Sequence, residues 1–215
     1  KYFLFSLLGS LFFLVSILYL GFMAGDFSFE RFYQLSLDTP TQLLLFTAFT
    51  LAFAIKLPMF PLHSWLPDAH TQASTAGSMM LAGVLLKLGG YGFIRFNLPI
   101  TSSASAILAP GMIVLSIIAI IYIGFVAVAQ TDIKRLIAYA SISHMGMITL
   151  GLFVVFYESN LLQNSTYIIS ISGVVVHMLS HGLSSAALFL CFGMLYQRVG
   201  SRKIEDYGGL MQVMP

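Results

Sequence analysis

Two lysines within apolar stretches are the residues of this sequence best suited to chemistry. Lys56 ends an otherwise uncharged run that starts at residue 39, and Lys87 lies inside the apolar run over residues 76–96. An ionisable side chain at membrane depth costs several kcal/mol, so it marks a functional site by default. At about 1.5 Å per residue, Lys87 lies roughly 17 Å deep, near the middle of a bilayer. We therefore predict that both lysines belong to an ion or proton site.

The stretch after Lys56 predicts a broken helix. Pro58 and Pro61 each remove a backbone donor and clash with a carbonyl four residues earlier, so the carbonyls of Ala54 and Leu57 are expected to lack helical partners. A helix broken in this way ends in a negative dipole that favours an ammonium group. Secondary transporters build ion sites near the midplane from such discontinuous helices.

For each lysine alone, the alternative is a side chain that reaches the membrane surface along its aliphatic stem. The surroundings of Lys87 favour a buried site, because small residues bracket it, as they do where helices or water approach closely. These residues are Gly83, Gly89, Gly90 and Gly92.

Three histidines in the later apolar runs are candidate relay residues. His144 lies beside serines, and His177 and His181 are one helical turn apart on one face. Neutral imidazole both gives and accepts a proton near physiological pH. The alternative for each is a hydrogen bond between helices. A metal site at His177 and His181 is not favoured, because no carboxylate or third histidine shares their helix.

Composition excludes several classes of protein. The chain of 215 residues is 58% hydrophobic and 8% charged, which is wrong for a soluble domain and typical of an integral membrane protein. The net charge of +2 without a basic run gives no support for nucleic-acid binding. Cys191 is the single cysteine, which excludes an internal disulfide and a cysteine-held metal cluster. Nucleotide-loop, dinucleotide and haem motifs are absent from the sequence, so redox chemistry is not expected in this chain.

The fold predicted from hydropathy is all-α, with about six transmembrane helices in one domain over residues 1–215. A run of about 20 apolar residues crosses a bilayer. The last predicted span is long for one crossing, so it is expected to bend near Gly173 or Gly182 or to extend beyond the membrane. Asp68 and His70, near Trp65, are expected to cap a span at the interface. The six spans cover residues 2–24, 41–70 with the break at 58–61, 75–96, 107–130, 134–156 and 164–197.

The cations predict the orientation of these spans. Alternating the spans places most lysines and arginines on one side, which the positive-inside rule assigns to the cytoplasm or matrix. Arg31 and Arg95 fall on the opposite side. The first group consists of Lys1, Lys134, Arg135, Arg198, Arg202 and Lys203.

Long motifs of this chain resemble the antiporter-like membrane subunits of respiratory complex I, most closely those of the subunit 4 or bacterial chain M type. The resemblance rests on KLPMFPLHSWLPDAH at residues 56–70, LAGVLLK at 81–87, QTDIKRLIAYASISHMG at 130–146 and MLSHG at 178–182. It covers residues 40–215 well. Ser74 departs from the proline that the family usually has there, which should loosen that turn slightly.

The resemblance implies a fourteen-helix fold with two inverted five-helix repeats, of which this chain supplies the end of the first and the start of the second. Lys56 matches the family's broken-helix lysine and Lys87 its central-axis lysine. His144 and His181 match the polar relay, and His177 matches it less well. The family's glutamate partner of the broken-helix lysine and its exit residue lie outside this sequence, so the chain is expected to be an excerpt or one piece of a split subunit.

The function implied is proton translocation within an NADH:quinone oxidoreductase, in the mitochondrial inner membrane or the bacterial plasma membrane. Flavin and iron–sulfur clusters are then expected in partner subunits, with no cofactor or metal in this chain and the quinone site elsewhere. The expected partners are other membrane-arm subunits, including neighbouring antiporter-like ones, the remaining segments of this subunit and lipid. Two alternatives stay open: the large subunit of a multi-subunit sodium/proton antiporter or membrane-bound hydrogenase, and a structural scaffold with silent lysines.

Overall fold

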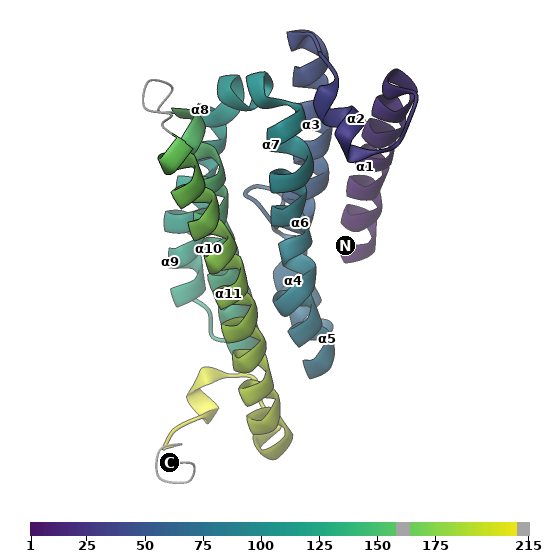
Figure 1. Cartoon of the computed structure of the whole chain (residues 1–215). Helices are drawn as coiled ribbons and strands as arrows, with labels where there is room; N and C mark the ends of the chain where they lie inside the picture. Colours follow the sequence, from purple (N-terminus) through teal and green to yellow (C-terminus); the bar gives the residue numbers. More distant parts are fainter. Residues whose placement is uncertain (158–163, 210–215) are drawn as a thin grey trace.

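The computed structural model describes residues 1–157 and 164–209, and in these residues the architecture is a bundle of helices (Figure 1). In the described part the only β pairing is an isolated bridge between Asp132 and Lys203. The predicted all-α fold is confirmed. The elements are α1 (Tyr2–Ala24), α2 (Phe29–Gln34), α3 (Thr39–Lys56), α4 (Trp65–Gln72), α5 (Thr75–Met80), η1 (Leu81–Leu85), α6 (Leu86–Gly92), η2 (Phe93–Asn97), α7 (Leu98–Ile100), α8 (Ser102–Ile118), η3 (Ala119–Ile123), α9 (Gly124–Val128), α10 (Ile133–Tyr157), α11 (Asn164–Val199) and η4 (Ile204–Asp206).

Six helical segments of the described chain are long and apolar enough to cross a membrane, as predicted. The third runs over Thr75–Ile100 and the fourth over Ser102–Val128, so both exceed their predicted lengths. The helix continues past residue 96 and through Pro99, which has no N–H for the carbonyl of Arg95 four residues earlier. That carbonyl accepts instead from the Tyr33 hydroxyl at 2.9 Å. Only Thr101, with φ −119° and ψ 44°, separates the two spans.

The predicted break after Lys56 is present, but the carbonyl of Ala54 is not free. The helix α3 ends at Lys56 and α4 begins at Trp65, with turns between them. The backbone N–H of Met59 donates to the Ala54 carbonyl at 2.8 Å, because the chain folds back directly after Pro58. The carbonyl of Ile55 accepts instead from the indole Nε1 of Trp65 at 3.0 Å. The Ala54 carbonyl thus lacks its regular helical partner, as expected from Pro58, but the Met59 N–H outside α3 satisfies it, and the Trp65 indole satisfies the Ile55 carbonyl.

Three π-helical turns in the described residues, η1, η2 and η3, interrupt the third and fourth spans. Such turns leave the regular ladder of backbone hydrogen bonds and are frequent at functional sites. The last span behaves differently, since α11 is one α-helix that runs through Gly173 and Gly182 without a break. The expected bend is not present as an interruption of the helix, and the extension of this 36-residue helix beyond the membrane stays a prediction.

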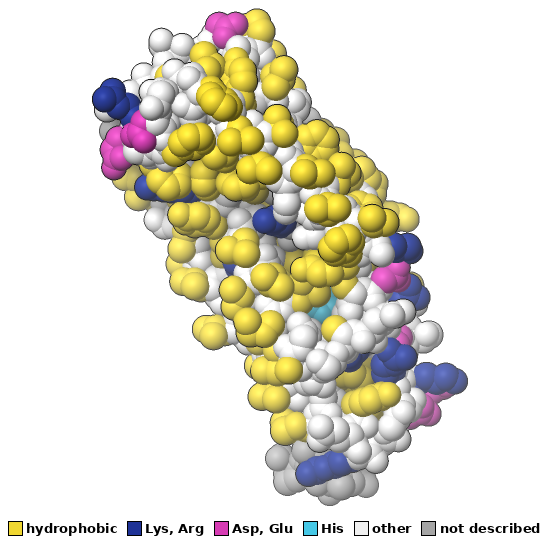
Figure 2. Space-filling model, turned by 90° about the vertical axis from the view of Figure 1, so that its right-hand side faces the viewer, with side chains coloured by type: hydrophobic (Ala, Val, Ile, Leu, Met, Phe, Trp, Pro, Cys, Tyr) yellow, Lys and Arg dark blue, Asp and Glu magenta, His cyan; other side chains and the backbone are white. Residues whose placement is uncertain are grey.

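A cluster of aromatic rings packs α3 against the third span. The rings of Phe49 and Phe53 stack with centroids 5.8 Å apart, and Phe93 meets Phe53 at 5.6 Å. Gly92 makes this packing possible, because a Cβ there would lie 2.3 Å from the Phe53 ring. The face of the bundle shown in Figure 2 is apolar over much of its area, as expected for contact with lipid.

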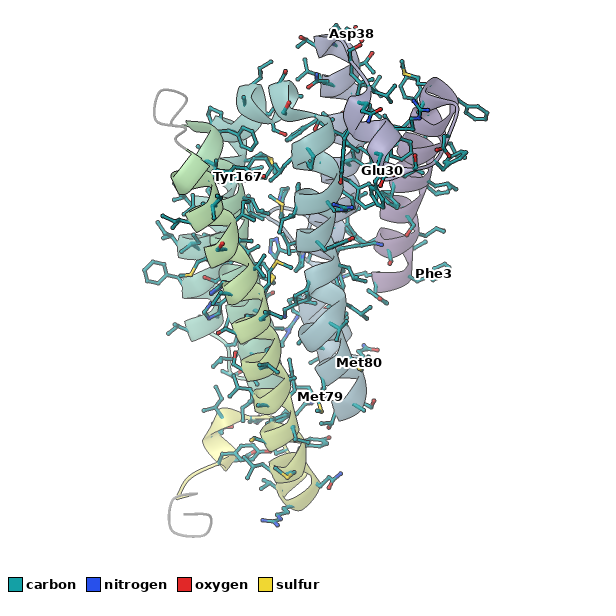
Figure 3. The ribbon with its side chains drawn as sticks, in the orientation of Figure 1. Phe3, Glu30, Asp38, Met79, Met80 and Tyr167 are labelled. Atoms are coloured by element: carbon teal, nitrogen blue, oxygen red, sulfur yellow. The ribbon has the colours of Figure 1, made fainter. Side chains whose placement is uncertain are left out.

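The cations gather as the positive-inside rule predicts. Lys1 and Arg135 both contact the Asp68 carboxylate, at 2.7 and 3.5 Å. Lys134 donates to the Ala73 carbonyl at 2.7 Å, and Arg202 to the Thr71 carbonyl at 2.7 Å, so they share this end of the bundle. Figure 3 shows Glu30 and Asp38 toward the opposite end. The compartment that each end faces stays a prediction.

Candidate functional site

Lys87 lies at the contact between the third and sixth spans. Its Nζ atom is 2.9 Å from Nδ1 of His181 on α11. The same ammonium donates to the carbonyl of Ala82, which belongs to the π-helical turn η1 that precedes Lys87. The predicted site residues Lys87 and His181, which are 94 positions apart in the sequence, are therefore direct partners.

The other two predicted histidines extend this contact. The ring of His144 on α10 lies 5.4 Å from the ring of His181 and 5.5 Å from that of His177, measured between centroids. The side chain of His181 is buried, with 6% of the residue exposed. The Nε2 atom of His177 is buried and lacks a hydrogen-bond partner within the described part of the chain. The structure thus brings His177 as close to His144 as it brings His181.

A cavity of about 160 Å³ opens beside the three histidines. One water needs roughly 10–15 Å³ of such space and two to four polar partners. The cavity therefore has room for several waters, and its wall supplies the polar partners. Its polar lining consists of Ser141, His144, His177, Ser180, His181, Ser184 and Ser185.

Lys56 lies apart from this cluster. It is half-buried at the end of α3 and lines a separate pocket of about 90 Å³ together with Tyr2, Trp65 and Leu86. Neither a hydrogen bond nor an ion pair joins Lys56 to another of the described side chains. Leu86 precedes Lys87 directly, so the two lysine environments adjoin through α6.

The prediction that His70 caps a span at the membrane interface was wrong, because His70 is buried. We expected it at the interface with Asp68, and Asp68 does carry the exposed ion pairs. His70 is fully buried, and its ring stacks on Phe189 of α11 with centroids 4.5 Å apart. Both ring nitrogens lack hydrogen-bond partners among the residues described. Because it lies within one helical turn of Asp68, hydropathy alone could not separate the two environments.

Metal coordination is not supported by the geometry. Residues 1–157 and 164–209 contain no group of three or more His, Cys, Asp or Glu side chains arranged to hold a metal ion. What the cluster offers chemically is a row of proton-exchanging groups, from an ammonium through imidazole rings to a polar cavity.

Comparison with known proteins identifies the family. The family described as "NADH:quinone oxidoreductase/Mrp antiporter, TM" matches residues 1–215. The chain belongs to this family. Its relatives include NADH-ubiquinone oxidoreductase chain 4 of Chondrus crispus, 45% identical over 215 residues, and NADH-quinone oxidoreductase subunit M of Rickettsia prowazekii, 48% identical over 217 residues. Both alignments cover 100% of this chain and 42% of the relative.

Solved structures agree with the family assignment. Respiratory complex I from Thermus thermophilus with bound NADH contains a chain that matches 98% of this one with a TM-score of 0.84 and 34% identity. This chain covers 43% of that one. The archaeal membrane-bound sulfane sulfur reductase matches with a TM-score of 0.74 at 24% identity, which shows the shared fold alone. The antiporter-like fold implied by the sequence motifs is thus confirmed, and the chain spans less than half the length of these relatives.

Proposed function

We propose that this chain is the central part of a proton-translocating membrane subunit of an NADH:quinone oxidoreductase, and that its relay consists of Lys87, His181, His144 and His177. The observation that carries the proposal is the 2.9 Å contact between Lys87 Nζ and His181 Nδ1. A charged donor in direct contact with an imidazole nitrogen is the arrangement that proton transfer needs. Names of relatives at 45% and 48% identity support the enzyme class.

The proton follows the order of the contacts. The Lys87 ammonium gives a proton to Nδ1 of the neutral His181 ring, which in that tautomer carries its hydrogen on Nε2. The His181 ring then releases the Nε2 proton to water in the cavity or to His144, whose ring is 5.4 Å away. His177, at 5.5 Å from His144, shares the same cavity wall.

Lys56 acts on this relay through its charge. A unit charge nearby shifts the protonation equilibrium of a second group by Coulomb interaction, which is strong where water is scarce. Lys56 adjoins the Lys87 helix through Leu86, which lines its pocket. We propose that an acidic partner from a helix of the same subunit, beyond the residues of this chain, neutralises Lys56 in one state and releases it in another.

The surroundings of the subunit follow from this assignment. The chain is an integral membrane protein, with homologues from mitochondria and bacteria. We propose that neighbouring antiporter-like subunits and other membrane-arm subunits contact it, and that flavin, iron–sulfur clusters and quinone are bound by partner subunits. Residues 1–215 then form one transmembrane domain at the junction of two inverted repeats.

Cation/proton antiport is a second candidate function, because the family description covers Mrp antiporters as well as NADH:quinone oxidoreductases. In an antiporter or a membrane-bound hydrogenase, the same lysine and histidine relay would be coupled to a source of energy other than NADH oxidation. The relatives named for chain 4 and subunit M favour the oxidoreductase.

The deciding experiment is to purify the native particle that contains this chain in mild detergent. NADH-driven quinone reduction in the particle, together with proton uptake into vesicles after reconstitution, is the expected result. Sodium-dependent proton exchange without NADH oxidation would move the chain to the antiporter branch. A particle with neither activity would support the scaffold alternative.

A further inference from the structure

Gly182 lies directly after His181 and forms a backbone contact with the π-helical turn before Lys87. A Cβ atom at position 182 would lie 2.9 Å from the carbonyl oxygen of Gly83 in η1. It would also lie 3.4 Å from Cε and 3.7 Å from Nζ of Lys87. The side chain of Lys87 therefore passes over the bare backbone of Gly182 on its way to His181.

This contact fixes the separation of α11 and η1. A clash with a backbone carbonyl cannot be relieved by rotating a side chain, so an added methyl group would force the two helices apart. The Ala82 carbonyl that holds the Lys87 ammonium lies in the same π-helical turn as Gly83. Any displacement of η1 from α11 would move Lys87 and its carbonyl acceptor away from His181 together.

We propose that Gly182 is a positioning residue that sets the distance between Lys87 and His181. The inference deepens the proposed relay and rests on it. Close packing alone is the competing explanation, since glycines commonly let membrane helices approach. The two explanations differ in where the effect of a substitution appears: in proton transfer between Lys87 and His181, or in assembly and stability.

The chain offers two matched controls. A Cβ at Gly83, on the other side of the same contact, would meet Ala186 Cβ at 3.6 Å and the Gly182 carbonyl at 3.7 Å, which are ordinary contacts. Gly83→Ala should therefore be tolerated. A Cβ at Gly193, lower on α11, would come within 2.3 Å of the Thr75 side chain. Gly193→Ala thus disturbs the packing of the same helix pair away from the relay.

The experiment compares these alanine variants in the full subunit within the assembled complex. We expect Gly182→Ala to assemble and to lower this subunit's share of NADH-driven proton translocation about tenfold, since a misplacement of about 1 Å can cost a hundredfold. Gly83→Ala and Gly193→Ala should translocate protons at the wild-type rate. Proton translocation by Gly182→Ala at the wild-type rate, or an equal loss in Gly193→Ala, would overturn the proposal.

A double substitution separates positioning from packing. In a His181→Ala background, the contact that Gly182 positions is already gone, so Gly182→Ala should cause no further loss of translocation. A further, additive loss would assign Gly182 to packing and overturn the proposal. If the Gly182→Ala subunit does not enter the complex, Gly83→Val replaces it, because its added methyl groups crowd the same contact between η1 and α11. Gly83→Val should then lower translocation in the wild-type background and cause no further loss in the His181→Ala background, and any other result would overturn the proposal.

The proposed relay itself is tested separately in the same series by Lys87→Ala. Normal translocation in Lys87→Ala would refute the relay. Loss in Lys87→Ala with normal translocation in Gly182→Ala would refute only the positioning role.

Discussion

Lys87 and Lys56 differ in how many hydrogen-bond partners the described residues of this chain supply to them. Lys87 has a carbonyl acceptor in a π-helical turn, an imidazole partner at 2.9 Å, and further histidines beyond it, all supplied by this chain. Lys56 stands at a broken helix in a pocket of about 90 Å³, with neither a hydrogen bond nor an ion pair to the described side chains. The two sites adjoin through one helix, yet among the described residues only Lys87 has an imidazole nitrogen within hydrogen-bond distance.

The difference indicates two roles for two similar lysines. A half-buried cation without a partner is sensitive to whatever charge approaches it, because desolvation penalises the unpaired ammonium. A cation held between two acceptors has a defined direction for its proton. We infer that Lys56 receives the electrostatic signal, whereas Lys87 gives the proton.

After Lys87 itself, the largest effect is expected at His181. His181→Ala removes the acceptor in contact with Lys87 and should reduce this subunit's share of NADH-driven proton translocation about a hundredfold, the lower range for a positioned proton-transfer group. Translocation in reconstituted vesicles is the measurement. The amount of assembled complex is the control, and a fully assembled His181→Ala complex that translocates normally would remove His181 from the relay.

A smaller effect is expected for Lys56→Ala. Because we propose that Lys56 acts through its charge and transfers no proton, its loss should slow this subunit's share of translocation by about tenfold, which corresponds to about 1.4 kcal/mol. Lys203→Ala is the matched control, because Lys203 is an exposed lysine whose ion pair with Glu205 is 69% and 74% exposed. A loss in Lys56→Ala as deep as that in His181→Ala would contradict the division of roles.

The last effect concerns the stability of the break beside Lys56, with little change expected in translocation. Trp65→Phe removes the indole donor of the Ile55 carbonyl and should destabilise the subunit by about 1–3 kcal/mol, the cost of an unsatisfied buried acceptor. The temperature at which the purified complex loses this subunit measures the change. Ser6→Ala, in the wall of the same pocket, should stay within about 0.5 kcal/mol. If Trp65→Phe and Ser6→Ala complexes lost this subunit at the same temperature, the indole hydrogen bond would not stabilise the break.

Much of the fold could be predicted from the sequence. Long apolar runs require helices in a bilayer, because backbone polar groups have no other partners there, and Pro58 removes a backbone donor that regular helical bonding needs. The place of Lys87 near the middle of the third span, Thr75–Ile100, followed from its position within the apolar run. The contact with His181 did not follow, because periodicity places each residue on its own helix but says nothing of which helices meet.

Other features of the structure could not be predicted from the amino-acid sequence. The π-helical turn η1 lies in an ordinary apolar stretch, since one additional residue per turn changes hydrogen bonding without changing composition. The burial of His70 depends on Phe189, which is 119 positions later in the sequence. Gly182 could be recognised only as a small residue. Its closeness to the Gly83 carbonyl is a property of the assembled helices.

The most direct test of the account is the number of protons translocated per NADH oxidised in a complex that carries Lys87→Ala. The account predicts that the complex assembles, that NADH oxidation continues, and that the share of translocation belonging to this subunit disappears. An unchanged ratio of protons to electrons in the assembled Lys87→Ala complex would contradict it, because the contact with His181 would then carry no proton.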